Sequence, residues 1–334
     1  MKLFERAVLS LIGTVTLTLI VMAVLVPVDR VARVPDAEFL PPDAVPEVVS
    51  AEELRIERLG DKQLRYTTGT LSRAFSNIGY DFHAVRAGES FVPRLFVTSL
   101  PRDMRKIRVA KKRKELFFKS VLPLVLHINE QIRADRTRLI AVRRMKANQQ
   151  KISAADQLWL AALADRYKVH RDDLSELTRR ADIIPPSIAL AQAAEESGWG
   201  TSRFVIEGNA LFGQWTVEGD RGIVPARRDA DRSHKIKVFE TLLDAVRAYA
   251  HNLNTHRAYR QFRSERADFR RGSTFLDGLA LSSSLSKYSE RGEDYVESLR
   301  SLIRGNRLGK LDGAKLSDKI VRHGSGGRSA NSAI

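Results

Sequence analysis

The chain has 334 residues, no cysteine and a formal net charge of +16. The absence of cysteine excludes disulfide bonds, a thiolate nucleophile and cysteine zinc sites. This length accommodates one membrane segment and one or two folded units. Two basic runs carry much of the charge, with eight Lys/Arg between Arg102 and Glu115 and seven from Arg304 to the end. Such runs bind polyanions (nucleic acid, anionic lipid headgroups or peptide carboxylates), or they are solvated faces.

Residues 7–28 carry no charged side chain and follow the short polar start that contains Lys2 and Arg6. At about 1.5 Å per residue, a helix of this length crosses about 30 Å of hydrocarbon. A secretory signal peptide has a shorter apolar core and a small-x-small cleavage site, which the sequence after Met22 does not offer. We expect residues 1–33 to be an uncleaved, single-pass anchor with the rest of the chain on the outer side.

Residues 34–90 are expected to be a linker and leader, because Val34 to Pro46 contains four prolines. Residues 91–150 are expected to be a basic helical region. Its main apolar stripe runs from Ala110 to about Asp135, where Pro123 should kink the helix. We expect residues 309–334, which are basic and rich in Gly and Ser, to be a disordered tail.

Helical patterns also dominate residues 151–308. Predicted helices follow a capping sequence at Ser153, begin near His170, run from Thr241 to about His256, and run from Tyr295 to about Arg304. A strand is predicted from Ile236 to Phe239, with a possible partner at Ile223 to Pro225. The pattern therefore predicts a mainly α fold with a small β-hairpin lobe.

The segment from Ala189 to Ser202 carries the clearest chemical signal. Pro185 and Pro186 open a helix whose apolar residues cover its whole circumference, so it should be buried. The helix ends in Glu195-Glu196-Ser197-Gly198-Trp199-Gly200, and Gln192 lies on the same side as Glu196. Burial and the negative end of the helix dipole both raise the pKa of such a carboxyl, which suits a general acid. A glutamate that simply emerges into solvent is the alternative.

Further motifs follow in order: Asn209-Ala210-Leu211-Phe212-Gly213, then the predicted hairpin, then Ala248-Tyr249-Ala250-His251-Asn252-Leu253. Together with Glu196 to Gly200 they resemble the glucosaminidase domain of glycoside hydrolase family 73, described as mannosyl-glycoprotein endo-β-N-acetylglucosaminidase-like. The resemblance covers roughly residues 150 to 308. Upstream, Phe91 to Pro101 and Phe118 to Leu126 are similar to the Bax-type bacterial envelope proteins, which join such a leader to this domain.

This resemblance implies a lysozyme-like α+β glucosaminidase domain over residues 151–308, with Glu196 aligned on the family's catalytic glutamate and Glu195 a weaker candidate. It also implies an acid on the hairpin lobe. Glu218 is the preferred residue, with Asp220, Asp229, Asp231 and Glu240 as alternatives and a solvated role equally open. The substrate's own 2-acetamido group could replace this acid as the nucleophile.

The resemblance also makes Tyr288 a cleft tyrosine, although Ser289 stands where the family usually has alanine. Five further residues are candidates for substrate binding: Gln192, Trp199, Asn209, Phe212 and Trp215. Among the aromatic ones, core packing is the commoner role, and only Trp215 is favoured to line the cleft. None of the seven histidines has metal-ligand spacing, so we expect neither metal nor cofactor.

These observations predict a peptidoglycan hydrolase of the endo-β-N-acetylglucosaminidase type. It would be anchored in the inner membrane by residues 7–28, with its catalytic domain in the periplasm acting on glycan strands. No motif favours nucleic acid. The alternatives are a muramidase or lytic transglycosylase on the same fold, and a non-catalytic wall-binding scaffold. A zinc amidase is more remote.

Overall fold

The computed structural model describes residues 66–216, 222–224, 235–272 and 275–318. They belong to the second of two compact units, Val49–Ile334. The first unit and the expected anchor at residues 7–28 lie outside the described residues. Among the residues described, no helix is both long and apolar enough to cross a membrane.

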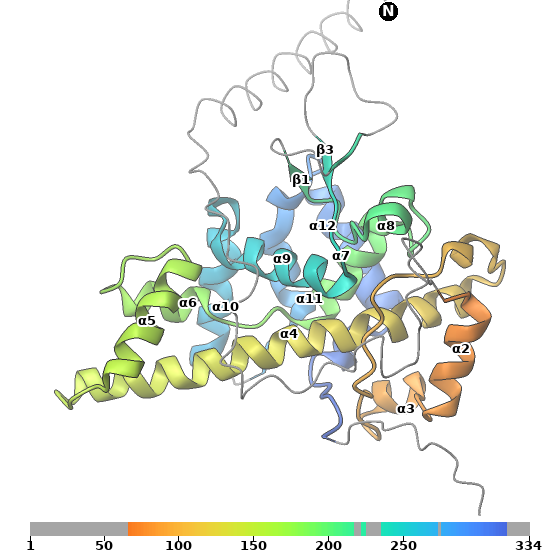
Figure 1. Cartoon of the computed structure of the whole chain (residues 1–334). Coiled ribbons are helices and arrows are strands. Elements are labelled where there is room, and N and C mark those ends of the chain that lie inside the picture. The colour runs from red at the N-terminus through yellow and green to blue at the C-terminus, as the bar shows by residue number, and fades with distance from the viewer. Residues whose placement is uncertain (1–65, 217–221, 225–234, 273–274, 319–334) are drawn as a thin grey trace, which may run out of the picture. The chain divides into compact units, whose positions relative to one another are not determined.

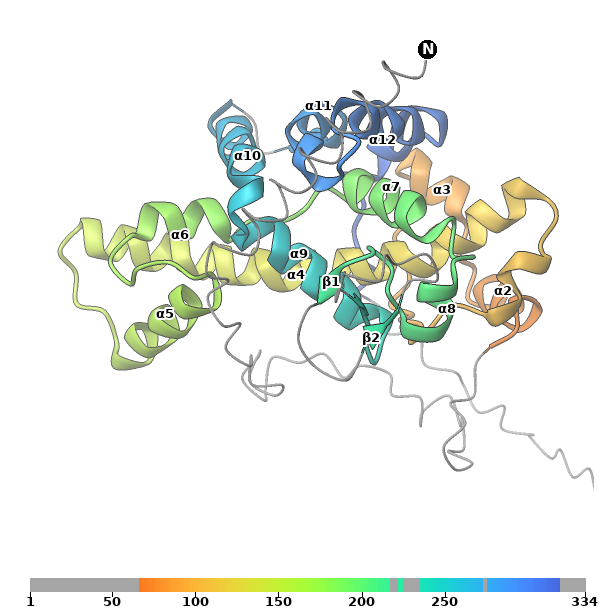
Figure 2. The same ribbon diagram turned by 90° about the horizontal axis from the view of Figure 1, so that it is seen from above.

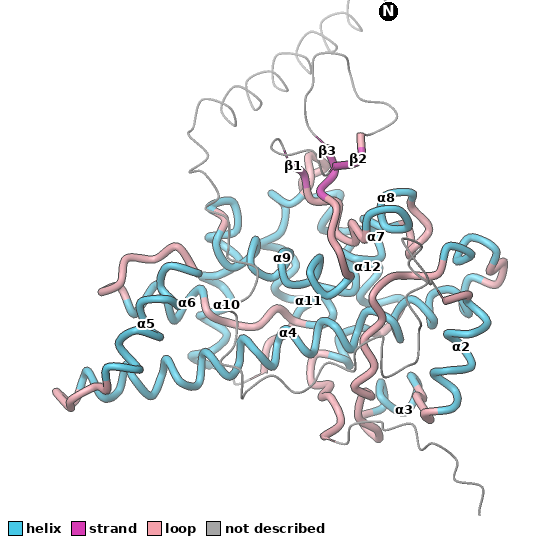
Figure 3. The backbone as a smooth tube through the Cα atoms, in the orientation of Figure 1, coloured by secondary structure: helices cyan, strands magenta, loops and turns pink. Residues whose placement is uncertain are grey.

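Helices dominate this unit, and three short strands form its only described sheet (Figures 1 and 3). The predicted class, mainly α with a small β lobe, is confirmed. The leader contributes α2 (Thr68–Asn77) and α3 (Phe82–Ala87), both within residues 34–90. Asp81 caps α3 by accepting hydrogen bonds from two backbone amides.

The longest element is α4 (Ala110–Ala147), which extends well beyond the predicted end near Asp135. Pro123 lies inside it, and nearly all side chains from Leu116 to Asn129 are buried. This central stretch is buried on every side because α2, α7 and α9 all contact α4 (Figure 2). The short 3₁₀ helix η2 (Arg102–Lys106) precedes it.

Two helices, α5 (Ala154–Arg166) and α6 (Leu174–Arg180), form a separate apolar cluster with the second half of α4. Ser153 caps α5 by accepting a hydrogen bond from the Asp156 amide, which confirms the predicted start of this helix.

The helix expected to carry the catalytic glutamate is α7 (Pro186–Ser197). Every residue from Pro186 to Ala194 is buried, and Gly198 ends the helix in the left-handed conformation with φ 55°. The helix packs between α4 and α12, as Figure 2 shows. A short helix, α8 (Arg203–Gly208), follows.

The sheet has the order β1-β3-β2 with both pairs antiparallel, formed by β1 (Trp215–Thr216), β2 (Gly222–Ile223) and β3 (Lys235–Lys237). Ile223 pairs with Ile236, which confirms the predicted hairpin partner. The predicted strand extended to Phe239, but β3 ends at Lys237 and Phe239 turns into the core.

The remaining elements are α9 (Leu242–Thr255), η3 (Arg257–Tyr259), α10 (Arg260–Gly272), α11 (Gly278–Leu281), η4 (Ser282–Tyr288), α12 (Glu293–Gly305) and η5 (Leu308–Leu311). A capping box between Thr241 and Asp244 starts α9, one residue after the predicted position.

Residues 309–318 are folded, although the sequence placed them in a disordered tail. Leu311 and Leu316 are buried, and Leu316 forms a parallel bridge with Val92. The Asp312 carboxylate accepts hydrogen bonds from the Ser187 backbone N–H at 2.7 Å and from its hydroxyl at 2.8 Å. This segment therefore joins the leader to the start of α7.

Candidate active site

Glu196 lies in the last turn of α7, where the buried helix reaches the surface. Its Oε1 accepts a hydrogen bond of 2.9 Å from the hydroxyl of Tyr295 on α12. The contact holds the carboxyl group against the core side of the helix end, so the side chain does not extend into bulk water.

A directed chain of hydrogen bonds stands behind this contact. The Tyr249 hydroxyl donates to Gln192 Oε1 at 2.6 Å, and Gln192 Nε2 donates to the Tyr295 oxygen at 2.9 Å. A phenol has a single proton, and Tyr295 uses its proton on Glu196 Oε1. Because Oε1 is an acceptor in this arrangement, the proton of a neutral Glu196 carboxyl resides on Oε2.

The other carboxyl oxygen faces Gly213. A Cβ atom at position 213 would lie 3.3 Å from Glu196 Oε2, and Gly213 has φ 61°, a conformation that favours glycine. The Asn-Ala-Leu-Phe-Gly turn thus passes beside the carboxyl group without placing a side chain in front of Oε2.

The electrostatic surroundings raise the pKa of Glu196 above that of an ordinary glutamate. Burial is the largest cause, and the negative charge of Glu195 adds to it. The hydrogen bond from Tyr295 and the charge of Arg291 act in the opposite direction and lower the pKa. Glu195 itself forms an ion pair of 2.7 Å with Arg291.

Four aromatic rings pack around the hydrogen-bond chain. Phe212 stacks on Tyr249 with ring centroids 3.8 Å apart, and Tyr288 stacks on Tyr295 at 5.6 Å. The Tyr288 hydroxyl donates to the Phe212 carbonyl at 3.2 Å. Burial raises the pKa of Tyr288 well above its usual range, so its hydroxyl stays protonated. The rings and the turn form one packed unit around Glu196.

Comparison with known proteins agrees with this arrangement. Residues 171–308 match the family described as mannosyl-glycoprotein endo-beta-N-acetylglucosaminidase. The chain is 34% identical over 219 residues to Protein bax of Escherichia coli strain K12, which covers 63% of this chain and 75% of that protein. The chain belongs to the Bax-type glucosaminidase-domain family. No solved structure matches it.

Membership of this Bax-type family indicates a glycosidase with a glycan substrate. Among the residues that the structure describes, no cluster of three His, Asp or Glu side chains could hold a metal ion. Glu218 lies outside the described residues, as do Asp220, Asp229 and Asp231. Glu240 is described; it follows β3 and its side chain is exposed.

Three of the residues expected to bind substrate are buried. Gln192 is fully buried within the hydrogen-bond chain, and Phe212 is covered by Tyr249. Asn209 ends α8, and its amide donates to the carbonyl oxygens of Phe239 and Glu240 at 3.2 and 2.9 Å. In this Bax-type domain these side chains brace the site and present almost no surface to a sugar.

The two tryptophans differ in their surroundings. Trp199 has its ring edge-on to Phe117 and Phe118, with Lys114 Nζ 4.4 Å from its centroid. Trp215 on β1 is 59% exposed. Trp215 therefore remains the better candidate for sugar contact.

Sequence reasoning missed Tyr295, the residue in direct contact with Glu196. From the sequence, Tyr295 was identified only as the first residue of a predicted helix, and the structure buries its side chain. Tyr249 was noticed only as part of the glucosaminidase-domain motif from Ala248 to Leu253. A signal was present in the polar Gln192 on an otherwise apolar helix, because a fully buried amide requires hydrogen-bond partners.

Proposed function

We propose that the chain is a peptidoglycan hydrolase that cleaves the β-1,4 glycosidic bond after N-acetylglucosamine, with Glu196 as the general acid. One observation carries this proposal: a partly buried carboxyl group with a raised pKa, whose Oε1 accepts the Tyr295 hydrogen bond while its Oε2 lies beside Gly213, a residue without a side chain. Glycoside hydrolysis requires such an acid, because the leaving oxygen must be protonated as its bond to C1 breaks.

In the proposed reaction, Glu196 Oε2 transfers its proton to the glycosidic oxygen, and the C1–O bond breaks toward the departing sugar. The positive charge on the remaining sugar is quenched by water, activated by a hairpin acid such as Glu218, or by the 2-acetamido oxygen followed by water. The new Glu196 carboxylate keeps the Tyr295 hydrogen bond, which strengthens when its acceptor is charged.

The other residues take supporting roles in this proposal. Gln192 and Tyr249 hold Tyr295, and therefore fix which oxygen of Glu196 carries the proton. Tyr288 braces the Phe212 turn and stacks on Tyr295. Trp215 offers an exposed ring to a pyranose face. The glycan would lie between α7 and the β hairpin, as in lysozyme-like domains.

The proposed place of action is the periplasmic side of the inner membrane. Support comes from the uncharged run of residues 7–28, which precedes the glucosaminidase domain. Membrane fractionation of the full chain, with protease added from the periplasmic side, tests this placement. A protein recovered only in soluble fractions, or protected from the protease, would contradict it.

The reaction is tested by digesting purified peptidoglycan with the full chain and analysing the products by mass spectrometry. The proposal expects reducing N-acetylglucosamine ends. Reducing muramic acid ends would indicate a muramidase, and anhydro-muramic ends a lytic transglycosylase. If neither the wild type nor Glu196→Gln cuts but both sediment with sacculi, the protein is a wall-binding scaffold. A parallel digestion with Glu218→Gln tests the hairpin acid.

A further inference from the structure

Exposed basic residues line the segment that leads into α4. They come from η2, the following link and the first turn of the helix, and we call them the basic strip: Arg102, Arg105, Lys106, Arg108, Lys111 and Lys112. Within the described part of the chain, none of the six forms an ion pair.

The acids next to the basic strip already have partners. Both oxygens of Asp103 accept hydrogen bonds from Thr68, at 3.0 and 2.8 Å. Glu115 forms an ion pair with Lys119 at 3.2 Å. Thr68 is neutral, so Asp103 keeps its negative charge, whereas the charge of Glu115 is balanced by Lys119. Six positive charges thus outnumber the one uncompensated carboxylate among them, and a surface with a net positive charge attracts anionic ligands.

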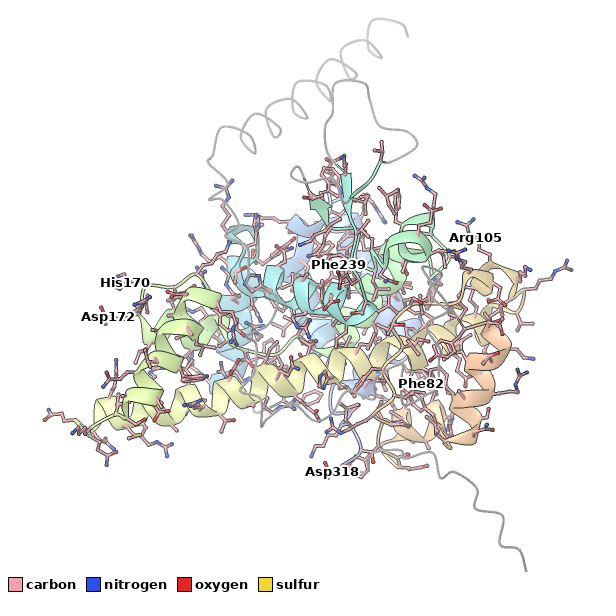
Figure 4. All side chains as sticks on the ribbon, viewed as in Figure 1. Phe82, Arg105, His170, Asp172, Phe239 and Asp318 are labelled. Carbon is pink, nitrogen blue, oxygen red and sulfur yellow. The ribbon has the colours of Figure 1, made fainter. Side chains whose placement is uncertain are left out.

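The basic strip is attached to the loop that leaves the catalytic helix. Arg105 Nε donates to the Thr201 carbonyl at 2.5 Å. Gly200 packs so closely on the segment before η2 that an added Cβ would lie 2.6 Å from Leu100 Cδ1. Thr201 is only five residues after Glu196. Figure 4 shows Arg105 beside the start of α4, at the opposite end of this unit from His170 and Asp172.

We propose that the basic strip binds the carboxylates of peptidoglycan stem peptides, so that the enzyme prefers peptide-bearing glycan to bare glycan strands. This inference rests on the proposed function. The sugar backbone of peptidoglycan carries no charge, whereas its peptides carry free carboxylates on every second sugar. Cations joined through Arg105 to the loop that follows Glu196 gain attraction only from those peptides, and such binding would orient the strand as well as retain it.

The test compares two substrates: intact peptidoglycan, and the same material after an amidase has removed its peptides. A quadruple variant removes four of the six positive charges with Lys106→Gln, Arg108→Gln, Lys111→Gln and Lys112→Gln, and keeps Arg105 because it holds the Thr201 carbonyl. A matched control removes the same charge from exposed residues elsewhere, using Arg133→Gln, Arg144→Gln, Lys146→Gln and Lys151→Gln. Activity is measured as reducing ends released, and binding as co-sedimentation.

The strip variant would lose four weak, solvent-exposed ion pairs with the peptide carboxylates. We therefore expect its kcat/KM on peptide-bearing glycan to fall about fivefold to tenfold, mainly through a higher KM. On bare glycan its activity should match the wild type, and the control should match on both substrates. High salt should remove the wild-type preference.

Equal losses on both substrates, or no loss on either, would overturn the inference. So would a strip variant that loses only its binding to anionic lipid vesicles, since the partner would then be a membrane surface. Co-sedimentation keeps this test separate from the catalytic proposal. If the wild type cuts neither substrate, the strip variant can still be compared with it by co-sedimentation. Weaker sedimentation of the variant with peptide-bearing glycan alone would still support the binding of peptide carboxylates by the strip.

Discussion

Two carboxyl groups of this protein, one buried and one partly buried, have pKa values that are shifted in opposite directions. Asp182, in the link before α7, is 2% exposed, and Glu196 at the end of α7 is only partly buried. Burial acts to raise both pKa values. Nevertheless the pKa of Asp182 is lowered by Arg266, Arg270 and Arg136, whereas that of Glu196 is raised. In this pair, three arginines outweigh the effect of burial on the pKa of Asp182, whereas the single arginine near Glu196 does not outweigh it.

The surroundings of Asp182 show what such cations do for the fold. Arg270 forms an ion pair with it at 2.9 Å, and Arg136 at 3.5 Å. Arg266 is fully buried and donates to the Asp182 and Ile183 carbonyls, each at 3.0 Å. The cluster joins α4 and α10 to the segment that leads into α7. Around Glu196, the buried partner is instead a neutral phenol, Tyr295.

The largest expected effect comes from Glu196→Gln. It removes the acidic proton while keeping the shape of the side chain, and it should lower kcat by about 100-fold to 10,000-fold. Thermal unfolding should be nearly unchanged, because the Tyr295 hydrogen bond can be kept. The measurement is the release of reducing ends. Comparable rates for variant and wild type would remove Glu196 from the mechanism.

Asp182→Asn is expected to damage stability and leave the chemistry of the folded enzyme intact. It breaks buried ion pairs with Arg270 and Arg136 and should cost about 3–5 kcal/mol in the free energy of unfolding. Denaturant titration measures the loss. Activity per folded molecule should equal that of the wild type, the reverse of the result expected at Glu196.

The lowered pKa of Asp182 also predicts how the stability difference between wild type and Asp182→Asn changes with pH. The folded pKa of Asp182 is lowered, so its contribution to stability is present above the unfolded value of about 3.9 and is lost as the pH falls through the folded pKa. The stability gap between wild type and Asp182→Asn should therefore narrow in acid. A gap that stays constant from pH 7 into acid would contradict this reading.

Tyr295→Phe should make Glu196 still less acidic. The hydroxyl of Tyr295 lowers the pKa of Glu196, so its loss raises that pKa further. The acid is active when protonated, and the alkaline limb of the pH–rate profile should move to higher pH. Loss of one hydrogen bond to a charged group should also lower kcat by about tenfold. Tyr167→Phe, another buried tyrosine, is the control and should leave the limb in place.

The smallest effect is expected from Arg291→Gln. Arg291 lowers the pKa of Glu196 and also neutralises Glu195, so its removal raises the pKa through both routes. The alkaline limb should move in the same direction as in Tyr295→Phe, by a smaller amount. Arg300→Gln removes a cation of α12 that pairs with Glu297 and should leave the profile unchanged. A downward shift for Arg291→Gln would contradict this assignment of charges.

Local rules predicted much of the fold. Helix starts at Ser153, Pro186 and Thr241 depend on capping and proline chemistry within four residues, and the structure has all three. The end of α4 was predicted too early because exposed basic residues interrupt the apolar stripe beyond Asp135. The helix continues in the structure because Leu139 and Val142 pack against α5 and α6.

The site was predictable only as far as its own helix. Glu196 and Gln192 share one face of α7, which spacing alone reveals. Their partners Tyr295 and Tyr249 lie 103 and 57 residues from Gln192 along the chain, and only tertiary packing brings them together. The role of Gly213 likewise depends on a turn that folds back over Oε2.

The bridge between Val92 and Leu316 also affects how the protein can be made. Arg94 Nε bonds the Ser317 carbonyl, 223 residues further along the chain, and Asp312 bonds Ser187 at the start of α7. At about 5–20 residues per second, a ribosome needs roughly 10–45 s to span that interval. A nascent chain lacks these contacts throughout this time, so the domain reaches its finished form only near the end of its own synthesis.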